Sequence, residues 1–148
     1  MEGRPELGGR VGYELKRVQH ALRQAMDEAL RETGVTTPQY AAMSVLAEEP
    51  GLSNARLARR SFVTPQTMNQ ILARLEASGL VERRGHPEHG RVLQNFLTRE
   101  GEGLLEGCDR SVDAVEERMV SDLTEADRRA LLESLRACAG ALARSSYD

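Results

Sequence analysis

The fold of this 148-residue chain is most clearly indicated by residues 53–97, SNARLARRSFVTPQTMNQILARLEASGLVERRGHPEHGRVLQNFL. Ser53 is a capping residue before a short helix over residues 54–61, in which Leu57 and Ala58 face inward. A turn at residues 62–63 follows, and Thr64-Pro65 begins a longer helix by the cap-then-proline pattern. Its apolar residues recur at i, i+3, i+4 and i+7 and predict one buried stripe: Met68, Ile71, Leu72 and Leu75.

A basic hairpin is expected directly after this helix pair. Residues 80–84 read as a short strand, residues 85–90 are dense in turn formers, and residues 91–97 read as the returning strand. Gly79 is the expected end of the preceding helix. A short helix, a tight turn, a longer helix and a hairpin together predict a winged helix-turn-helix.

Such a unit places its second helix in the major groove of DNA, with the N-terminal residues at the base edges. Asn and Gln side chains can pair with adenine, and Arg with guanine. On the hairpin, Arg91 is expected in the minor groove, and Arg83 or Arg84 on phosphate. The residues expected to contact DNA are Ser53, Asn54, Thr64, Gln66, Thr67, Asn69, Gln70, Arg74, Arg83, Arg84 and Arg91.

Helices are expected on both sides of this unit. One runs from about residue 7 or 12 to residue 32, with Gly34 as the stop signal behind it. The next begins with Thr37 as its cap and Pro38 in its first turn. Thr98 caps a long helix to about residue 122, and Thr124 restarts a last helix. The order is four helices, two strands and two helices, with a minimal strand at Leu52 as an option.

The outer helices have apolar seams that fit helix–helix packing. In the first helix, the seam consists of Leu15, Val18, Leu22, Ala25 and Ala29. The long helix after the hairpin presents Leu104, Cys108, Val112, Val115 and Met119 along one side. In the last helix the seam is formed by Leu131, Leu135, Cys138 and Leu142.

Charge is distributed unevenly along the chain. The whole chain has a formal net charge of −3, but residues 53–99 contain eight arginines and three glutamates, a net of +5. The remainder holds 12 basic and 20 acidic residues. A local basic region is what a phosphate backbone attracts, whereas the alternative is a solvated arginine-rich face without a nucleic-acid partner.

Other function classes find little support in the sequence. There is no nucleophile-elbow context, no glycine-rich phosphate loop and no His-Glu-x-x-His motif, so we expect neither an enzyme nor a cofactor. His86, Glu88 and His89 read as a solvated turn rather than a metal site. No signal peptide and no run of ~20 apolar residues is visible, which indicates a cytoplasmic protein without a membrane partner.

The central residues resemble the MarR (multiple antibiotic resistance regulator) family. The resemblance rests on Pro38-Gln39-Tyr40 and the following Ala-Met-Ser-Val-Leu, on residues 52–58, on residues 64–83 and on Leu97-Thr98-x-x-Gly101. The stretch 86–91 resembles the family's wing tip, Asp-Pro-x-Asp-x-Arg. Both customary acids are histidines here, His86 and His89, which leaves the pose of Arg91 open.

The resemblance implies a homodimer that represses transcription from a roughly palindromic site. It also implies dimerisation segments at 1–36 and 100–148 around a DNA-binding lobe at 37–99. Many members release DNA when a small aromatic or phenolic molecule binds between these parts. By position, the residues that would line such a cleft are His20, Met26, Tyr40, Met43 and Cys108.

Several alternatives remain open at this point. Met26, Tyr40 and Met43 also fit a plain hydrophobic core. Two other functions are alternatives to a ligand-responsive repressor. One is a winged-helix protein-interaction module without an operator, and the other is a regulator that senses oxidants through Cys108 or Cys138. Because both cysteines lie on helix seams, buried structural thiols are the preferred interpretation.

Overall fold

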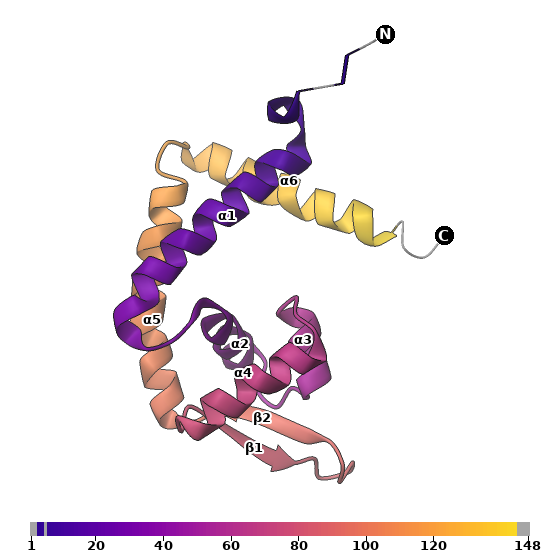
Figure 1. Cartoon of the computed structure of the whole chain (residues 1–148), viewed down its shortest axis with the longest axis vertical. Coiled ribbons are helices and arrows are strands. Elements are labelled where there is room, and N and C mark those ends of the chain that lie inside the picture. Colours follow the sequence, from indigo (N-terminus) through magenta and orange to yellow (C-terminus); the bar gives the residue numbers. More distant parts are fainter. Residues whose placement is uncertain (1–2, 5, 145–148) are drawn as a thin grey trace. The chain divides into compact units, whose positions relative to one another are not determined.

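The computed structural model of the protein describes residues 3–4 and 6–144 (Figure 1). The first helices are α1 (Val11–Leu30), α2 (Thr37–Glu48), α3 (Asn54–Arg60) and α4 (Pro65–Ala77). The hairpin β1 (Val81–Gly85) and β2 (Leu93–Leu97) follows, and then α5 (Arg99–Met119) and α6 (Glu125–Arg144). Short 3-10 turns occupy Leu7–Gly9 and Arg31–Thr33. This order confirms the predicted fold, a mainly helical chain with one β-hairpin.

The described chain divides into two compact units, and the boundary follows Asp113, inside α5. The first unit contains α1 to α4, the hairpin and the first part of α5. The second contains the end of α5 and α6. The candidate DNA-contacting residues all belong to the first unit.

Side-chain caps begin helices α2, α3 and α4, and one of these caps differs from expectation. The hydroxyl of Ser53 accepts from the backbone N–H of Arg56, and that of Thr64 from the N–H of Thr67. Helix α2 is capped by Thr36, not by Thr37 as the sequence suggested. The reason is a capping box: Gln39 lies three residues after Thr36, so the two residues exchange side-chain and backbone hydrogen bonds.

The core of the first unit is aliphatic. The predicted stripe of α4 is buried, with Met68 and Leu72 at 0% exposure, and it packs with Leu57 and Ala58 of α3. Helix α2 contributes Ala42, Met43 and Leu46. From α5 the core receives Cys108 and Val112 as predicted. It also receives Leu105, which the expected seam did not include.

The hairpin is antiparallel, and Val81 pairs with Leu97 at its base. Its second strand begins at Leu93 rather than Arg91, because Val92 donates to His89 and accepts from His86 within the tip. Arg91 therefore lies in the turn. Leu52 forms an isolated bridge with Asn95, which confirms the minimal third strand.

The outer helices show much less burial than the lobe. Only Leu30 of α1 is buried, while Leu15 and Val18 of its seam are exposed. In α6 no described residue is buried, and Leu131 and Leu135 are exposed. Cys138 is exposed as well, so the expectation of a buried thiol is wrong for this residue in the single chain.

Candidate nucleic-acid interface

Helix α4 presents a polar face opposite its buried stripe. Gln66, Thr67, Asn69, Gln70 and Arg74 are all exposed. The helical periodicity forces this outcome, because the apolar stripe occupies the side that faces the core. A row of amides, one hydroxyl and one guanidinium is therefore available to a partner.

Two grooves flank this face. The first has a volume of about 430 Å³, and it brings α3, α4 and the wing tip together. Its lining residues include Ser53, Asn54, Asn69 and Arg91. The second, of about 650 Å³, lies between α4 and the start of α2. Thr67, Gln70 and Arg74 line it from α4, and Thr36, Pro38 and Gln39 from α2. Together the grooves collect seven of the eleven predicted contact residues.

Three of the predicted residues already have structural roles. The hydroxyls of Ser53 and Thr64 cap α3 and α4. The amide of Asn54 is bonded on both sides, to Asn69 and to Asn95. These residues thus hold the starts of the two helices in place, and their side chains reach the same surface as the exposed face of α4.

The arginines of the basic region differ in how far they are neutralised. Arg60 pairs with Glu49 at 3.0 Å and with Glu48 at 3.2 Å, which raises the pKa of Arg60 through these hydrogen bonds. Arg56 also lies 3.5 Å from Glu49. Within the described residues, no carboxylate lies within 4.0 Å of four arginines of this region: Arg59, Arg74, Arg91 and Arg99.

Both strand arginines of the wing are engaged within the protein. The Arg83 side chain is 18% exposed, and its Nε lies 3.6 Å from Glu76. Arg84 is 3.1 Å from Glu82 and stacks on the Phe96 ring, 4.6 Å from its centroid. The Arg84 guanidinium lowers the pKa of the Glu82 carboxyl. Arg91 therefore has the most accessible charge of the three wing arginines.

The two wing histidines replace the customary acids without loss of the turn. His86 Nδ1 accepts from the backbone N–H groups of Glu88, at 3.0 Å, and His89, at 3.2 Å. A carboxylate at residue 86 would accept the same two donors. The two imidazole rings lie 4.8 Å apart. The tip thus retains an acceptor at its first residue, and Arg91 follows it in the turn.

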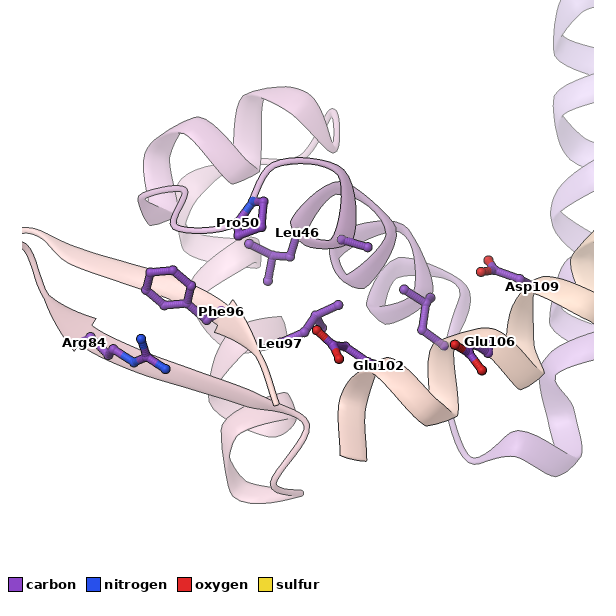
Figure 2. Close-up of a pocket in the computed structure, with 10 residues that line it drawn as sticks. Leu46, Pro50, Arg84, Phe96, Leu97, Glu102, Glu106 and Asp109 are labelled. Atoms are coloured by element: carbon purple, nitrogen blue, oxygen red, sulfur yellow. The ribbon is translucent and has the colours of Figure 1, made fainter. Parts of the chain in front are cut away.

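A separate cavity of about 410 Å³ lies between α2, the hairpin and the start of α5 (Figure 2). Figure 2 shows Glu102, Glu106 and Asp109 on the α5 side, and Arg84 and Phe96 on the hairpin side. None of the five predicted effector residues lines it. Its three carboxylates make it unfavourable for an anion.

The predicted effector residues lie in different environments. Met43 and Cys108 are completely buried, and burial raises the pKa of the Cys108 thiol. Met26 and Tyr40 are half-buried against the core, and His20 is exposed. The Tyr40 hydroxyl donates to Asp109 at 2.6 Å. Burial, followed by this bond, raises the pKa of Tyr40 to about 12.

The part of the chain that the structure describes contains neither a metal-ligand cluster nor a membrane-spanning helix. No group of three His, Cys, Asp or Glu side chains is arranged to hold a metal ion in residues 3–4 and 6–144. Over the same residues, no helix combines the length and the apolar character needed to cross a bilayer.

Two features of the interface were not predicted from the sequence. The start of α2 borders the second groove, and the capping pair Thr36 and Gln39 was the signal that could have located it. Asn95 is fully buried in β2 and bonds to Asn54. The signal for Asn95 was a polar residue that alternates with Leu93 and Leu97 on one face of β2, where an unpaired buried amide is costly.

The comparisons with known proteins agree with this geometry. A sequence model of the MarR family matches residues 33–92. The transcriptional repressor Rv2887 of Mycobacterium tuberculosis is 39% identical over 119 residues, which are 80% of this chain and 86% of that repressor. The structure of Rv2887 in complex with DNA covers 88% of this chain and 98% of its own, with 34% identity and a TM-score of 0.73.

A further structure of Rv2887, in complex with salicylic acid, covers 93% of this chain and 98% of its own. It has 35% identity and a TM-score of 0.72. Identity above 30% over most of both chains, together with the shared order of elements, is decisive for the family. The chain belongs to the MarR family of winged helix-turn-helix transcriptional regulators.

Proposed function

We propose that this protein is a repressor that binds a pseudo-palindromic operator as a homodimer and responds to a small aromatic effector. The observation that supports this most directly is the exposed polar face of α4 between two grooves, one of which it shares with Arg91 of the wing. A protein-contact module would not need amides and unpaired arginines on one surface. The related Rv2887 has been solved in complex with DNA.

Homodimerisation is supported by the exposed apolar residues of the outer helices. Leu131, Leu132 and Leu135 of α6 and Val11 and Val18 of α1 are exposed in the single chain. Leucines at helical spacing that remain open to water favour a second copy of the chain. The dimerisation segments are then 1–36 and 100–148, on either side of the DNA-binding lobe at 37–99, and the protein acts in the cytoplasm.

The test of operator binding is selection of purified protein against a random duplex library at near-physiological salt. A dimeric groove reader enriches a palindrome whose half-sites lie about 10 bp apart. Arg91→Ala should weaken binding to most sequences, whereas Gln66→Ala and Gln70→Ala should alter base preference. Binding that only fades as salt rises, with no enriched sequence, would favour the protein-contact module instead.

The effector response is supported by the relative's complex with salicylic acid. We expect the effector to contact the half-buried Met26 and Tyr40 beside His20, with Met43 and Cys108 beneath them. Salicylate titrated into the operator complex should release DNA, and Tyr40→Phe should raise the concentration needed. Release that is unchanged in Tyr40→Phe and His20→Ala would place the effector elsewhere. If peroxide rather than salicylate releases DNA, the protein is a thiol sensor.

A further inference from the structure

Three asparagines form a chain of hydrogen bonds from the interior of the wing to the exposed face of α4. Asn95 of β2 is fully buried, and its Nδ2 donates to Leu52 O at 2.9 Å and to Asn54 Oδ1 at 2.8 Å. Asn54, the first residue of α3, donates from its own Nδ2 to Asn69 Oδ1 at 2.6 Å. The chain therefore crosses three elements and ends on a residue of the candidate DNA-binding face.

The direction of this chain is fixed at its buried end. Leu52 O is a backbone carbonyl and can only accept, so the Asn95 amide must turn its NH₂ group toward Leu52. The second hydrogen of that NH₂ then requires the oxygen of Asn54, and the NH₂ of Asn54 in turn requires the oxygen of Asn69. Each amide has one donor side and one acceptor side, so one fixed carbonyl orients all three.

The opposite orientation of Asn95 is excluded by its surroundings. Its Oδ1 is buried and has no partner in the described part of the chain, which costs about 1–3 kcal/mol. Turning the amide around would place that oxygen against Leu52 O and Asn54 Oδ1, two further acceptors, and would lose both hydrogen bonds. The observed orientation is the cheaper one, so the polarity of the chain is stable.

Asn69 is consequently not a free amide. Its Oδ1 accepts from Asn54 Nδ2, so the carbonyl points toward Asn54 and the NH₂ group points away from it, and no hydrogen bond from Asn69 Nδ2 is found among the described residues. Asn69 is exposed and lines the groove that also contains Arg91. We propose that Asn69 is a specificity-determining residue that offers only donors to DNA and reads a keto oxygen, guanine O6 or thymine O4, with Asn54 and Asn95 as positioning residues. This inference rests on the proposed function.

The groups that the bases present in the major groove explain why Asn69 should prefer a keto oxygen. In the major groove guanine presents O6 and N7 and thymine presents O4, which are all acceptors. Adenine and cytosine present an amino group in place of that keto oxygen, and this amino group would face the NH₂ of Asn69 donor against donor. Adenine N7 is an acceptor as well, but guanine has the same N7, so the keto oxygen or amino group makes the difference between the bases. Pairing of a free asparagine with adenine uses its oxygen together with its nitrogen, and here the oxygen is engaged with Asn54.

The test reverses the hydrogen bond between Asn54 and Asn69 and leaves Asn69, the residue expected to contact the base, unchanged. Asn54→Asp keeps an acceptor for Asn95 but presents a second acceptor to Asn69, which must then turn its NH₂ inward and its oxygen toward DNA. Library selection with the full-length protein and with Asn69→Ala first identifies the operator position whose preference Asn69 sets. At that position Asn54→Asp should shift preference from guanine or thymine to adenine or cytosine, by about tenfold. Asn69→Asp should shift it the same way.

Ala55→Asp is the matched control, because Ala55 is exposed and lines the same groove. This substitution adds the same negative charge but takes no part in the hydrogen bonds between the three asparagines. It should lower affinity for all sequences alike. If the unaltered protein prefers adenine or cytosine at the Asn69 position, the inference is wrong. The inference is also wrong if Asn54→Asp, like Ala55→Asp, only lowers affinity for all sequences and leaves the base preference unchanged. If the unaltered protein enriches no sequence at all, the proposed function fails first, and that outcome is distinguishable from both.

Discussion

Helices α4 and α6 contain similar apolar stripes, yet only one of them is buried. In α4 the residues at i, i+3, i+4 and i+7 are enclosed by the first unit, and Leu72 is 0% exposed. In α6 no described residue is buried, and Leu135 is 40% exposed. The spacing of leucines thus predicts that a face will be covered, but not which chain covers it. The lobe completes its own core, whereas we propose that another copy of the protein covers the apolar stripe of α6.

The largest effect on stability is expected from a substitution in the buried stripe of α4. Leu72→Ala removes a completely enclosed side chain and leaves a cavity, so it should lower the free energy of unfolding by about 3 kcal/mol. Urea denaturation followed by circular dichroism measures this loss.

Leu135→Asp on α6 is the counterpart: it should convert dimer to monomer in analytical ultracentrifugation. A Leu135→Asp protein that remains dimeric would contradict the role assigned to α6.

The second effect concerns the contact between the lobe and the start of α5. A Cβ on Gly101 would lie 2.2 Å from Leu80 O, a backbone atom that cannot yield without moving the loop before β1. Gly101→Ala should therefore cost about 2 kcal/mol in thermal denaturation. Gly103→Ala, two residues further along the same helix, meets no atom within 4 Å and should be neutral or stabilising by up to about 1 kcal/mol. Equal effects of the two variants would contradict the close approach.

A smaller effect is expected at the bond that joins α2 to α5. Tyr40→Phe removes the hydrogen bond to Asp109 and should lower stability by about 1 kcal/mol at neutral pH. Since the pKa of Tyr40 is raised from 10.0 to about 12, its contribution is complete below pH 10 and is lost as pH rises from 10 to 12. Unfolding curves of both proteins across this range should converge. A constant difference would show that the bond does not stabilise the neutral phenol.

The smallest effect tests whether any exposed apolar residue behaves like those of α6. Phe62 in the turn between α3 and α4 is 94% exposed and has φ of 57°, a conformation that glycine adopts without strain. Relief of strain and the added freedom of the unfolded chain oppose each other, so Phe62→Gly should change stability by less than about 1 kcal/mol. Sedimentation should show an unchanged dimer. Dissociation of this variant would make Phe62 part of the interface.

Local patterns were sufficient for most of the elements and for the exposed face of α4. Cap residues and the apolar period predicted α3 and α4 closely, because both are short-range effects. The cap of α2 was misplaced by one residue because Thr36 and Thr37 are both capable, and the position of Gln39 decides between them. The start of the second strand was misplaced by two residues because the turn that begins at His86 continues through Val92.

The winged helix-turn-helix and the set of polar residues on α4 followed from the sequence alone, since they depend on periodicity, capping and turn chemistry along one segment. The family followed from the resemblance of the motifs in residues 38–101. Which of those residues are free to contact DNA depends on tertiary contacts. Arg83 is held near Glu76, Arg84 on Glu82 and Phe96, and Asn69 by an amide chain that begins at Leu52. Hydrogen bonds and ion pairs between distant segments consume donors and acceptors, and spacing along the chain does not record which segments meet.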